Sequence, residues 1–306
     1  MSLSTSLSLS EVNVMQVSIA YLAVLLIWST TPLAIVWSSE TMPPTFAVLL
    51  RMLIAVFLGY MIIAAKKISI PWHKEARLLY TYSGIGIFGG MTFSYLAAGY
   101  LSSGILSLVF GLAPIISSVL ASKMLDEPKV STTKKIAMVI SIIGLGIVCA
   151  DNFTLEDNAV FGLIYVLCAV FLFSLSGVLV KSVSLDIPPL ATTMGALSVS
   201  IPFFTITWLL VDGSIGLHLW EYRSIFSTIY LGVFGSLIGF YAYYLVLQKL
   251  SPSTVALITL ITPVIALSLG ALLNNEPLTT TLVGGALMVL FGLALYNKNA
   301  FIRKRP

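Results

Sequence analysis

Residues 113–128 read APIISSVLASKMLDEP, and residues 262–277 read TPVIALSLGALLNNEP. Both stretches place a proline second and end on a Glu-Pro pair, so one hydrophobic pattern occurs twice. A shift of 149 residues maps Pro263 onto Pro114 and Glu276 onto Glu127. The sequence therefore predicts an internal duplication.

The duplication extends back along both halves of the chain. The shift of 149 also maps the pair Gly235 and Gly239 onto the pair Gly86 and Gly90. Near the start of each half, a shift of 145 maps Ser174 onto Ser29 and Pro188-Pro189 onto Pro43-Pro44. The halves are thus predicted to be copies of one unit, with about four extra residues between these two registers.

The composition indicates a protein that resides in lipid. Hydrophobic residues make up 58% of the 306 residues, only 9% are charged, and the mean hydropathy is +1.03, whereas soluble domains are about 25% charged. A helix needs about 20 mostly apolar residues to cross the hydrocarbon core, because its peptide groups must be hydrogen-bonded within the segment. Ten such segments can be read, at 17–37, 44–64, 78–98, 104–125, 133–150, 159–180, 189–211, 224–246, 254–274 and 280–297.

The basic residues predict the orientation of these helices, since Lys and Arg are retained on the cytoplasmic side of short loops. With a cytoplasmic N-terminus, every Lys and Arg except Arg51 and Arg223 falls in a cytoplasmic segment. Both termini are therefore predicted to be cytoplasmic. This distribution explains the net charge of +4 without a nucleic-acid partner, because the basic residues lie at the membrane edges.

The fold class expected is an all-α integral membrane protein with two inverted five-helix repeats. Five is an odd number, so the second copy must enter the membrane from the opposite side. Such repeats are a recurrent plan of secondary transporters, because two similar halves that exchange conformations turn an inward-open state into an outward-open one. The expected units are a cytoplasmic tail at 1–16, repeats at 17–150 and 159–297, and a basic cytoplasmic tail at 298–306.

This chain of ten predicted helices combines three features. The first helix contains Trp28-Ser29, the second has Arg51 near its start, and the fourth and ninth each contain a proline followed thirteen residues later by Glu-Pro. In these features the chain resembles the EamA branch of the drug/metabolite transporter superfamily. The resemblance implies a multi-pass carrier of the bacterial inner membrane, usually an exporter of amino acids or related metabolites. It also implies a central cavity lined by the first, third, fourth, sixth, eighth and ninth helices, with the fifth and tenth at the back.

Arg51 is the strongest candidate for a substrate-binding residue, because a charge within a span costs about 2.5–3.5 kcal/mol at the bilayer centre. Steps of four place it on one helix face with Ala47, Ala55 and Gly59, a small-residue face that suits close packing. Every Asp and Glu lies in a loop or at a helix end, so the substrate could supply the carboxylate that Arg51 lacks. The alternative is a structural pin bonded to backbone carbonyls, which the presence of Arg here across the family favours.

The other cavity candidates are polar, aromatic or helix-breaking residues within the predicted spans. They are Trp28, Ser29, Thr30, Tyr95, Ser107, Pro114, Ser174, Tyr241, Tyr244, Thr259 and Pro263. The polar cluster of the first helix lies mid-span, where an interfacial role does not explain it. Tyr95 and Tyr244 fit interfacial aromatic belts equally well. Each of the two prolines removes a backbone donor, which either frees a carbonyl for a solute or only shapes the packing.

Glu127 and Glu276 end the fourth and ninth helices on opposite faces of the membrane. They are expected to stop the helices and anchor them, since each precedes a proline, and a gating role is the alternative. The glycine pairs Gly86/Gly90 and Gly235/Gly239 are interpreted as helix-packing seams.

The sequence offers no P-loop, metal-ligand cluster, GxSxG motif or intramembrane histidine. We therefore predict no enzymatic activity, metal or cofactor, and a secondary carrier whose partners are membrane lipids and a small substrate such as an amino acid. A flippase for lipid or lipid-linked cargo and a non-transporting membrane partner or sensor remain alternatives. Substrate, direction, coupling and oligomeric state stay open.

Overall fold

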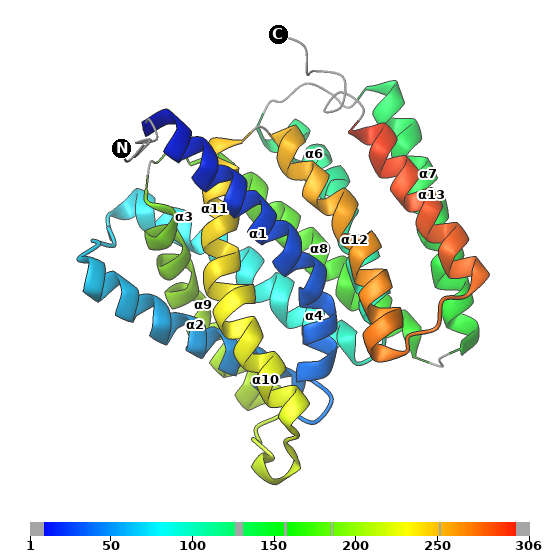
Figure 1. Ribbon diagram of the computed structural model, residues 1–306, viewed down its shortest axis with the longest axis horizontal. Helices are drawn as coiled ribbons and strands as arrows, with labels where there is room; N and C mark the ends of the chain where they lie inside the picture. Colours follow the sequence, from blue (N-terminus) through cyan, green and yellow to red (C-terminus); the bar gives the residue numbers. More distant parts are fainter. Residues whose placement is uncertain are drawn as a thin grey trace, which may run out of the picture.

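The computed structural model describes residues 9–125, 131–155, 158–183, 185, 187–250 and 252–297, and only the backbone of residues 9–14, 149–155, 252–254, 256 and 257. The described chain is helical, and none of it forms a strand (Figure 1). In chain order the elements are α1 (Leu9–Ser38), α2 (Pro44–Lys66), α3 (Lys74–Ile85), η1 (Gly86–Gly90), α4 (Met91–Ala98), α5 (Ser103–Phe110), α6 (Ala113–Met124), α7 (Thr132–Leu155), α8 (Ala159–Lys181), α9 (Pro189–Val211), η2 (Leu217–Leu219), α10 (Tyr222–Tyr230), η3 (Leu231–Ile238), α11 (Gly239–Lys249), α12 (Pro252–Asn274) and α13 (Thr280–Tyr296).

Six stretches of the described helices are long and apolar enough to cross a membrane. They are Met15–Ser38, Pro44–Lys66, Ser103–Met124, Ala159–Lys181, Pro189–Val211 and Tyr222–Lys249. Large apolar side chains cover their outward faces; Phe57, Leu210 and Phe226, for example, are 66%, 80% and 66% exposed. An apolar surface of this extent marks a protein that contacts lipid. The chain is therefore a multi-pass membrane protein.

The predicted third and eighth helices are interrupted, although their positions agree with the prediction. A π-helix, η1, separates α3 from α4, and a second π-helix, η3, separates α10 from α11. Each coincides with a predicted glycine pair: Gly86 and Gly90 bound η1, while Gly235 lies in η3 and Gly239 follows it. Glycine weakens an α-helix by about 1 kcal/mol relative to alanine, which lowers the cost of a π turn at these sites.

The predicted fourth helix is likewise broken, into α5 and α6, at Gly111 and Leu112. Pro114 lies in the first turn of α6, where its missing N–H costs no hydrogen bond. The N–H of Gly111 donates to the carbonyls of Ser107 and Leu108, both at 3.1 Å, which closes the end of α5. Pro263 behaves differently, because it lies within the continuous helix α12. The two matched prolines therefore lie in different settings, one just after a helix break and the other within a continuous helix.

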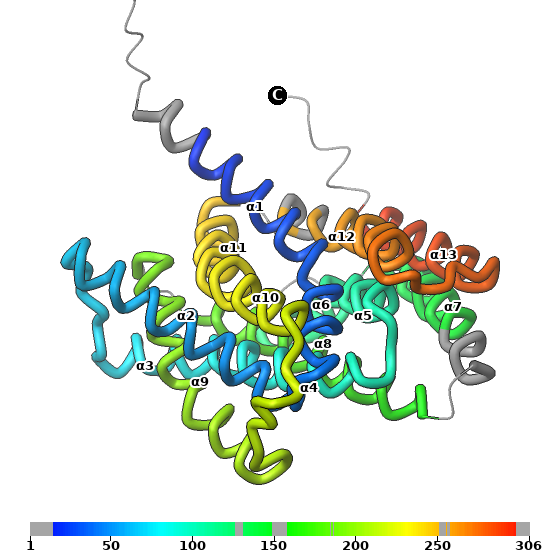
Figure 2. Tube along the Cα trace, turned by 60° about the horizontal axis from the view of Figure 1, so that its bottom comes forward, coloured from blue at the N-terminus to red at the C-terminus, as the bar shows by residue number. Residues whose placement is uncertain are grey.

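Helices α7 and α13 pack against each other along one edge of the molecule, and α2, α3 and α9 lie on the opposite side of the central helices (Figures 1 and 2). The α7 and α13 backbones approach closely where glycines face each other. A Cβ atom at Gly285 would lie 2.7 Å from the carbonyl oxygen of Gly144, a distance no side chain tolerates. These two helices correspond to the fifth and tenth predicted spans.

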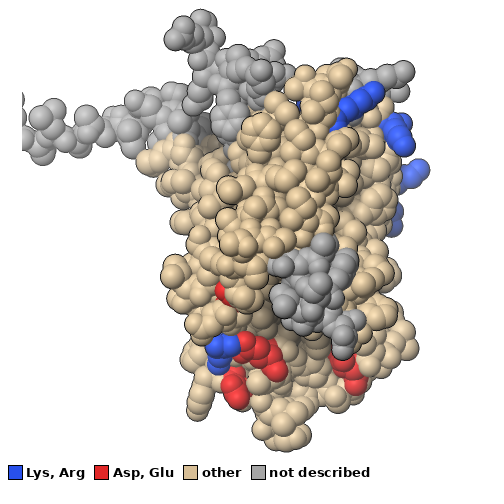
Figure 3. Space-filling model, turned by 90° about the vertical axis from the view of Figure 1, so that its right-hand side faces the viewer, with Lys and Arg blue, Asp and Glu red and all other residues tan. Residues whose placement is uncertain are grey.

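Charged residues divide between the two ends of the helices (Figure 3). The end formed by the connections at 39–43, 99–102, 212–221 and 275–279 carries Glu40, Asp212, Glu221 and Glu276, and we call it the acidic end. The opposite end, called the basic end, carries most of the lysines. Helix α1 begins at Leu9, before the membrane span predicted from residue 17, because its first residues include no helix breaker.

A candidate functional site in a central cavity

A cavity lies among the central helices and offers about 90 Å³ to the centres of water-sized molecules. Since one water needs about 10–15 Å³ on this measure, the cavity holds several waters or a small solute. Residues from α1, α2, α4, α5, α6, α8, η3, α11 and α12 surround it. The lining residues are Trp28, Thr31, Pro32, Ile35, Arg51, Met91, Ser94, Leu106, Ser107, Phe110, Ala113, Phe173, Gly235, Phe240, Thr259 and Thr262. No described residue of α7 or α13 is among them.

Arg51 reaches the cavity from α2 because its helix face is packed inward. Ala47 and Ala55, one turn to either side, are fully buried, while Phe57 points outward. Space for the guanidinium comes from η3, where a Cβ at Gly235 would lie 3.0 Å from Arg51 Nη2. The predicted small-residue face of α2 thus packs against the glycine seam of η3, and the arginine lies at this junction.

One nitrogen of the Arg51 guanidinium is hydrogen-bonded, and another has no hydrogen-bond partner. Its Nε donates a 2.9 Å hydrogen bond to Ser236 Oγ, and its Cζ lies 5.8 Å from the ring centre of Tyr95. Nη1 has no hydrogen-bond partner, although Arg51 is only 1% exposed. Leaving a buried charge without a partner costs several kcal/mol. Because Arg51 lines the cavity, the site is suited to an anion that pairs with its guanidinium.

Aromatic rings form the wall of the cavity toward the basic end. The Trp28 ring lies 5.8 Å from Phe173 and 5.1 Å from Tyr243 between centroids, and Phe173 lies 6.2 Å from Phe110. We call these four residues the aromatic layer. Edge-to-face and tilted pairs at such distances stabilise by about 0.5–1.5 kcal/mol each.

A second, smaller cavity of about 10 Å³ lies beyond this layer, lined by residues such as Ser83, Ser176 and Tyr244. Phe173 and Phe240 line both cavities. From them α8 and α11 run on to Lys181 and Lys249 at the basic end. The two phenylalanines therefore stand between the central cavity and the second cavity.

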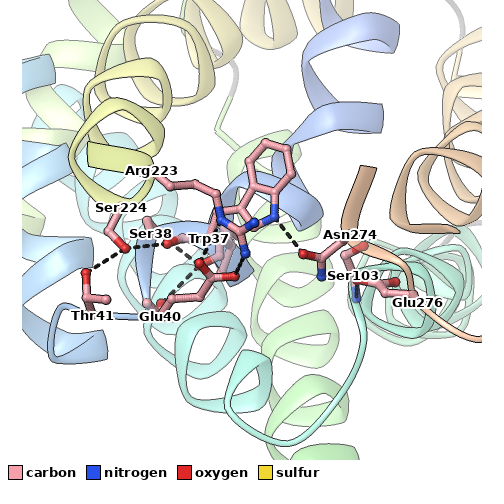
Figure 4. Close-up of polar contacts among 11 residues, drawn as sticks. Trp37, Ser38, Glu40, Thr41, Ser103, Arg223, Ser224, Asn274 and Glu276 are labelled. Atoms are coloured by element: carbon pink, nitrogen blue, oxygen red, sulfur yellow. Dashed lines mark hydrogen bonds and ion pairs between the residues drawn. The ribbon is translucent and has the colours of Figure 1, made fainter. Parts of the chain in front are cut away.

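Polar contacts join several helix ends at the acidic end (Figure 4). Trp37 Nε1 donates to Asn274 Oδ1 at 2.8 Å, and Asn274 Nδ2 donates to Glu276 Oε1 at 3.1 Å. Glu276 also accepts hydrogen bonds from the backbone N–H groups of Ser103, at 3.0 Å, and Gly104, at 3.2 Å. A carboxylate at a helix N-terminus is favoured by the exposed N–H groups and the helix dipole. We call this chain of contacts the polar layer; it joins α1 and α12 to α5.

Arg223 and Glu40 extend the polar layer toward α10. Arg223 Nε donates to Glu40 Oε2 at 2.8 Å, its Nη2 pairs with Glu40 Oε1, and its Cζ lies 5.1 Å from the Trp37 ring centre. Ser224 Oγ donates to the Trp37 carbonyl at 2.7 Å. Trp37 is therefore held by α10 on one side and α12 on the other.

Four of the predicted cavity residues line the central cavity: Trp28, Arg51, Ser107 and Thr259. Three more lie beside it. Tyr95 is below the guanidinium, Ser174 donates to the carbonyl of the lining residue Ala113 at 3.2 Å, and Tyr244 lines the second cavity. Burial of both Tyr95 and Tyr244 excludes the interfacial-belt interpretation for them.

The remaining predicted cavity residues lie outside the lining. Ser29 is buried and bonded to the Leu25 carbonyl, and Thr30 faces Tyr230, with 2.6 Å between the hydroxyl oxygens. The prediction placed Tyr241 in the cavity, but it points outward and is 40% exposed, since successive residues of a helix are about 100° apart and Phe240 faces inward. Pro114 and Pro263 adjoin the lining residues Ala113 and Thr262 without lining the cavity themselves.

The predicted helix-end residues are described only in part. Glu127 lies outside the described residues. Glu276 ends α12 as predicted, and in addition it caps α5. Among the seam glycines, a Cβ at Gly86 would lie 2.6 Å from Ser176 Cβ of α8, so that glycine faces a neighbouring helix. Gly90 is less crowded, with Phe173 atoms at 3.6 Å or more.

The sequence interpretation missed the aromatic walls Phe110, Phe173 and Phe240, because phenylalanine in an apolar span gives no distinguishing signal. Phe173, however, could have been predicted from the duplication. The shift of 145 that maps Ser174 onto Ser29 also maps Phe173 onto Trp28, and these two rings meet in the structure. Ser236, Trp37 and Asn274 had no such signal, since their partners come from distant parts of the chain.

Comparison with known proteins agrees with this architecture. The model of the EamA-like transporter family matches residues 15–150 and again residues 160–298. The chain therefore belongs to the EamA-like transporter family and is a membrane transporter of the drug/metabolite type.

Relatives align along most of this chain. An uncharacterized transporter of Archaeoglobus fulgidus is 27% identical over 91% of this chain and 95% of its own length. A protein of Escherichia coli named as a probable amino-acid metabolite efflux pump is 24% identical over 89% of this chain and 91% of its own. A protein crystal structure superposes with a TM-score of 0.67 at 17% identity, covering 94% of this chain and 99% of the other. At that identity the likeness concerns the fold.

Proposed function

We propose that this transporter is a secondary carrier that exports small metabolites such as amino acids by alternating access. The central cavity with its unpaired cationic group carries the proposal. It lies between the polar layer at the acidic end and the aromatic layer toward the basic end. A carrier needs two such barriers, each of which opens in turn while the other stays closed.

The matched halves support this mechanism. We propose inverted repeats at 17–150 and 159–297, flanked by cytoplasmic tails. In the two halves, corresponding positions carry the π-helices η1 and η3, and Trp28 meets its counterpart Phe173 at the centre of the molecule. Two similar halves in contact at an aromatic pair can exchange conformations by rocking about it.

The charge distribution supports an orientation in which the basic end is cytoplasmic. Lys66, Lys67, Lys74 and Lys181 lie at that end, as expected for residues retained inside short loops. The cavity then opens to the cytoplasm through the region of Phe173 and Phe240, and to the outside through the polar layer. We place the protein in the bacterial inner membrane on the strength of this pattern and of its bacterial relatives.

The relatives named as probable amino-acid metabolite efflux pumps support amino acids or their metabolites as cargo. Within the proposed site, Arg51 binds the substrate, Trp28, Ser107 and Thr259 form the wall, and Tyr95 and Ser174 support it. Glu276 is assigned to the outer barrier, and the glycine seams to helix packing and sliding.

Transport by purified protein in proteoliposomes tests the proposal. Vesicles preloaded with a mixture of unlabelled amino acids and carboxylates should accumulate a labelled member of the mixture from outside, as expected of counterflow through a carrier. Protein-free vesicles serve as the control. Movement of fluorescent lipid between leaflets without solute counterflow would instead indicate a flippase, and neither activity in folded protein would indicate a non-transporting membrane protein.

A further inference from the structure

We infer that the cavity selects small monocarboxylates with an apolar side group, anchored at Arg51, and that an α-ammonium group adds nothing to their recognition. This inference rests on the proposed function and specifies the substrate class of the same cavity. The reasoning depends on which charges the cavity contains and on the chemistry of its walls.

The first step concerns the anchor. A guanidinium stays protonated in proteins, so Arg51 brings a permanent positive charge into the cavity. Ser236 occupies Nε, and Nη1 has no partner. Because Arg51 lines the cavity, a carboxylate bound there could pair with the guanidinium and provide both the missing negative charge and a hydrogen-bond acceptor. Charge-assisted hydrogen bonds of this kind are about twice as strong as neutral ones.

The second step concerns any further charge on the ligand. Within the described part of the chain, Arg51 is the sole charged residue that lines the cavity. The polar groups around it are the hydroxyls of Thr31, Ser94, Ser107, Thr259 and Thr262. A hydroxyl accepts a hydrogen bond from an ammonium but supplies no negative charge. The desolvation of an ammonium is therefore not offset by an ion pair, and a second carboxylate meets no second cation.

The third step concerns the remainder of the ligand. Trp28, Phe110, Phe173 and Phe240 present ring surfaces to the cavity, together with Met91. Burial of an apolar group against them is favourable by about 25 cal/mol for each Å² removed from water. The cavity thus combines one cationic anchor with an apolar wall, which matches a carboxylate on an apolar or aromatic side group.

Thermal stabilisation of the purified protein by four matched probes tests the selectivity, because a ligand of the native state raises its stability. The probes are 3-phenylpropionate, L-phenylalanine, 2-phenylethylamine and phenylsuccinate, which share the ring and differ in charge. We expect 3-phenylpropionate to stabilise at least as much as phenylalanine, and phenylethylamine and phenylsuccinate to have little effect. Stabilisation by phenylethylamine, or tighter binding of phenylalanine than of 3-phenylpropionate by about tenfold, would overturn the inference, as would no stabilisation by either monocarboxylate.

Variants then test the anchor. Arg51→Gln should weaken 3-phenylpropionate binding by about 10- to 100-fold, the range expected when a hydrogen bond to a charged group is lost. Arg77→Gln is the matched control, since Arg77 is exposed at the basic end, and it should bind like the unmodified protein. Should Arg51→Gln not fold, Ser236→Ala keeps the charge but releases Nε, and is expected to weaken binding without changing the order of the probes. Unchanged binding of 3-phenylpropionate by a folded Arg51→Gln variant would contradict the role of Arg51 as the anchor. If only Ser236→Ala folds, unchanged binding by that variant would contradict it.

Counterflow measurements distinguish a failure of this inference about substrate class from a failure of the proposed carrier function. Counterflow of cationic or zwitterionic solutes in preference to monocarboxylates would refute the substrate class and leave the carrier intact. Folded protein without counterflow of any solute would refute the carrier itself.

Discussion

Trp37 donates a 2.8 Å hydrogen bond from its indole nitrogen to Oδ1 of Asn274, which joins the end of α1 to the end of α12. The bond lies only a short distance from the cavity, because Ile35, two residues earlier in the same helix, lines the cavity. Asn274 in turn bonds to Glu276, whose carboxylate caps α5. One continuous set of polar contacts therefore holds three helices together over the site.

The polar layer should set how readily the cavity opens at the acidic end. Glu276→Gln replaces a carboxylate that accepts two backbone hydrogen bonds by an amide with only one accepting oxygen, so we expect the outward-open state to gain population. The reporter is a cysteine at Ser94 in a protein whose Cys149 and Cys168 are replaced by alanine. Its labelling from the acidic side by an impermeant thiol reagent should accelerate by about tenfold.

Glu221→Gln is the control for that measurement, since Glu221 is exposed at the same end. It should leave the labelling rate unchanged. Equal rates in all three proteins would show that the polar layer does not hold the acidic end closed.

The aromatic layer should limit access from the basic end. Phe173→Ala removes the ring that Trp28, Phe110 and Tyr243 all contact, and so joins the two cavities. We expect faster labelling of the same reporter from the basic side and a passive leak of substrate in proteoliposomes. Phe171→Ala, on the outward face of the same helix, should change neither quantity. If Phe173→Ala showed the same labelling rate and the same substrate leak as the unmodified protein, the aromatic layer would not limit access from the basic end.

The contact between α7 and α13 can be tested with two glycines on one helix. A Cβ at Gly144 would lie 2.8 Å from the Gly285 carbonyl oxygen, whereas a Cβ at Gly146 would meet nothing within 4 Å. Gly144→Ala should therefore destabilise the protein by about 1–3 kcal/mol through overpacking. Gly146→Ala should be neutral or stabilise it by up to about 1 kcal/mol. Melting temperatures in detergent measure both, and equal values would show that the two helices do not pack as described.

The orientation is tested by two serines in exposed connections, Ser69 at the basic end and Ser214 at the acidic end. In the cysteine-free background, Ser69→Cys should be protected from an impermeant reagent added to intact cells, and Ser214→Cys should react. The reverse pattern would overturn the positive-inside assignment.

The extent of the helices followed from the sequence wherever a span was uniformly apolar. The segments 44–64, 159–180 and 189–211 coincide closely with α2, α8 and α9. Interruptions were not foreseen, because a π-helix or a break at Gly111 depends on how a neighbouring helix fills the space, and hydropathy does not record that. The duplication pointed to the right places: both π-helices lie at the glycine pairs that it matched.

A residue of the site could be predicted from the sequence where burying its charge in the membrane costs free energy. Arg51 stood out because a charge in a span needs a reason, and the structure does place it at the cavity. Tyr241 was misplaced because a polar group in an apolar helix does not reveal which face turns inward. Trp37 and Asn274 could not be paired at all, since 237 positions separate them and only the folded chain brings them together.

Alternating access itself is tested most directly by the cysteine at Ser94, a buried residue that lines the cavity. In sealed vesicles of known orientation, an impermeant thiol reagent should label it from either side, and a saturating transported solute should slow both reactions. A cysteine at Ser29, buried and outside the lining, should react from neither side. Labelling of the Ser94 cysteine from one side alone, whatever solute is present, would contradict a carrier that opens its cavity to both faces of the membrane.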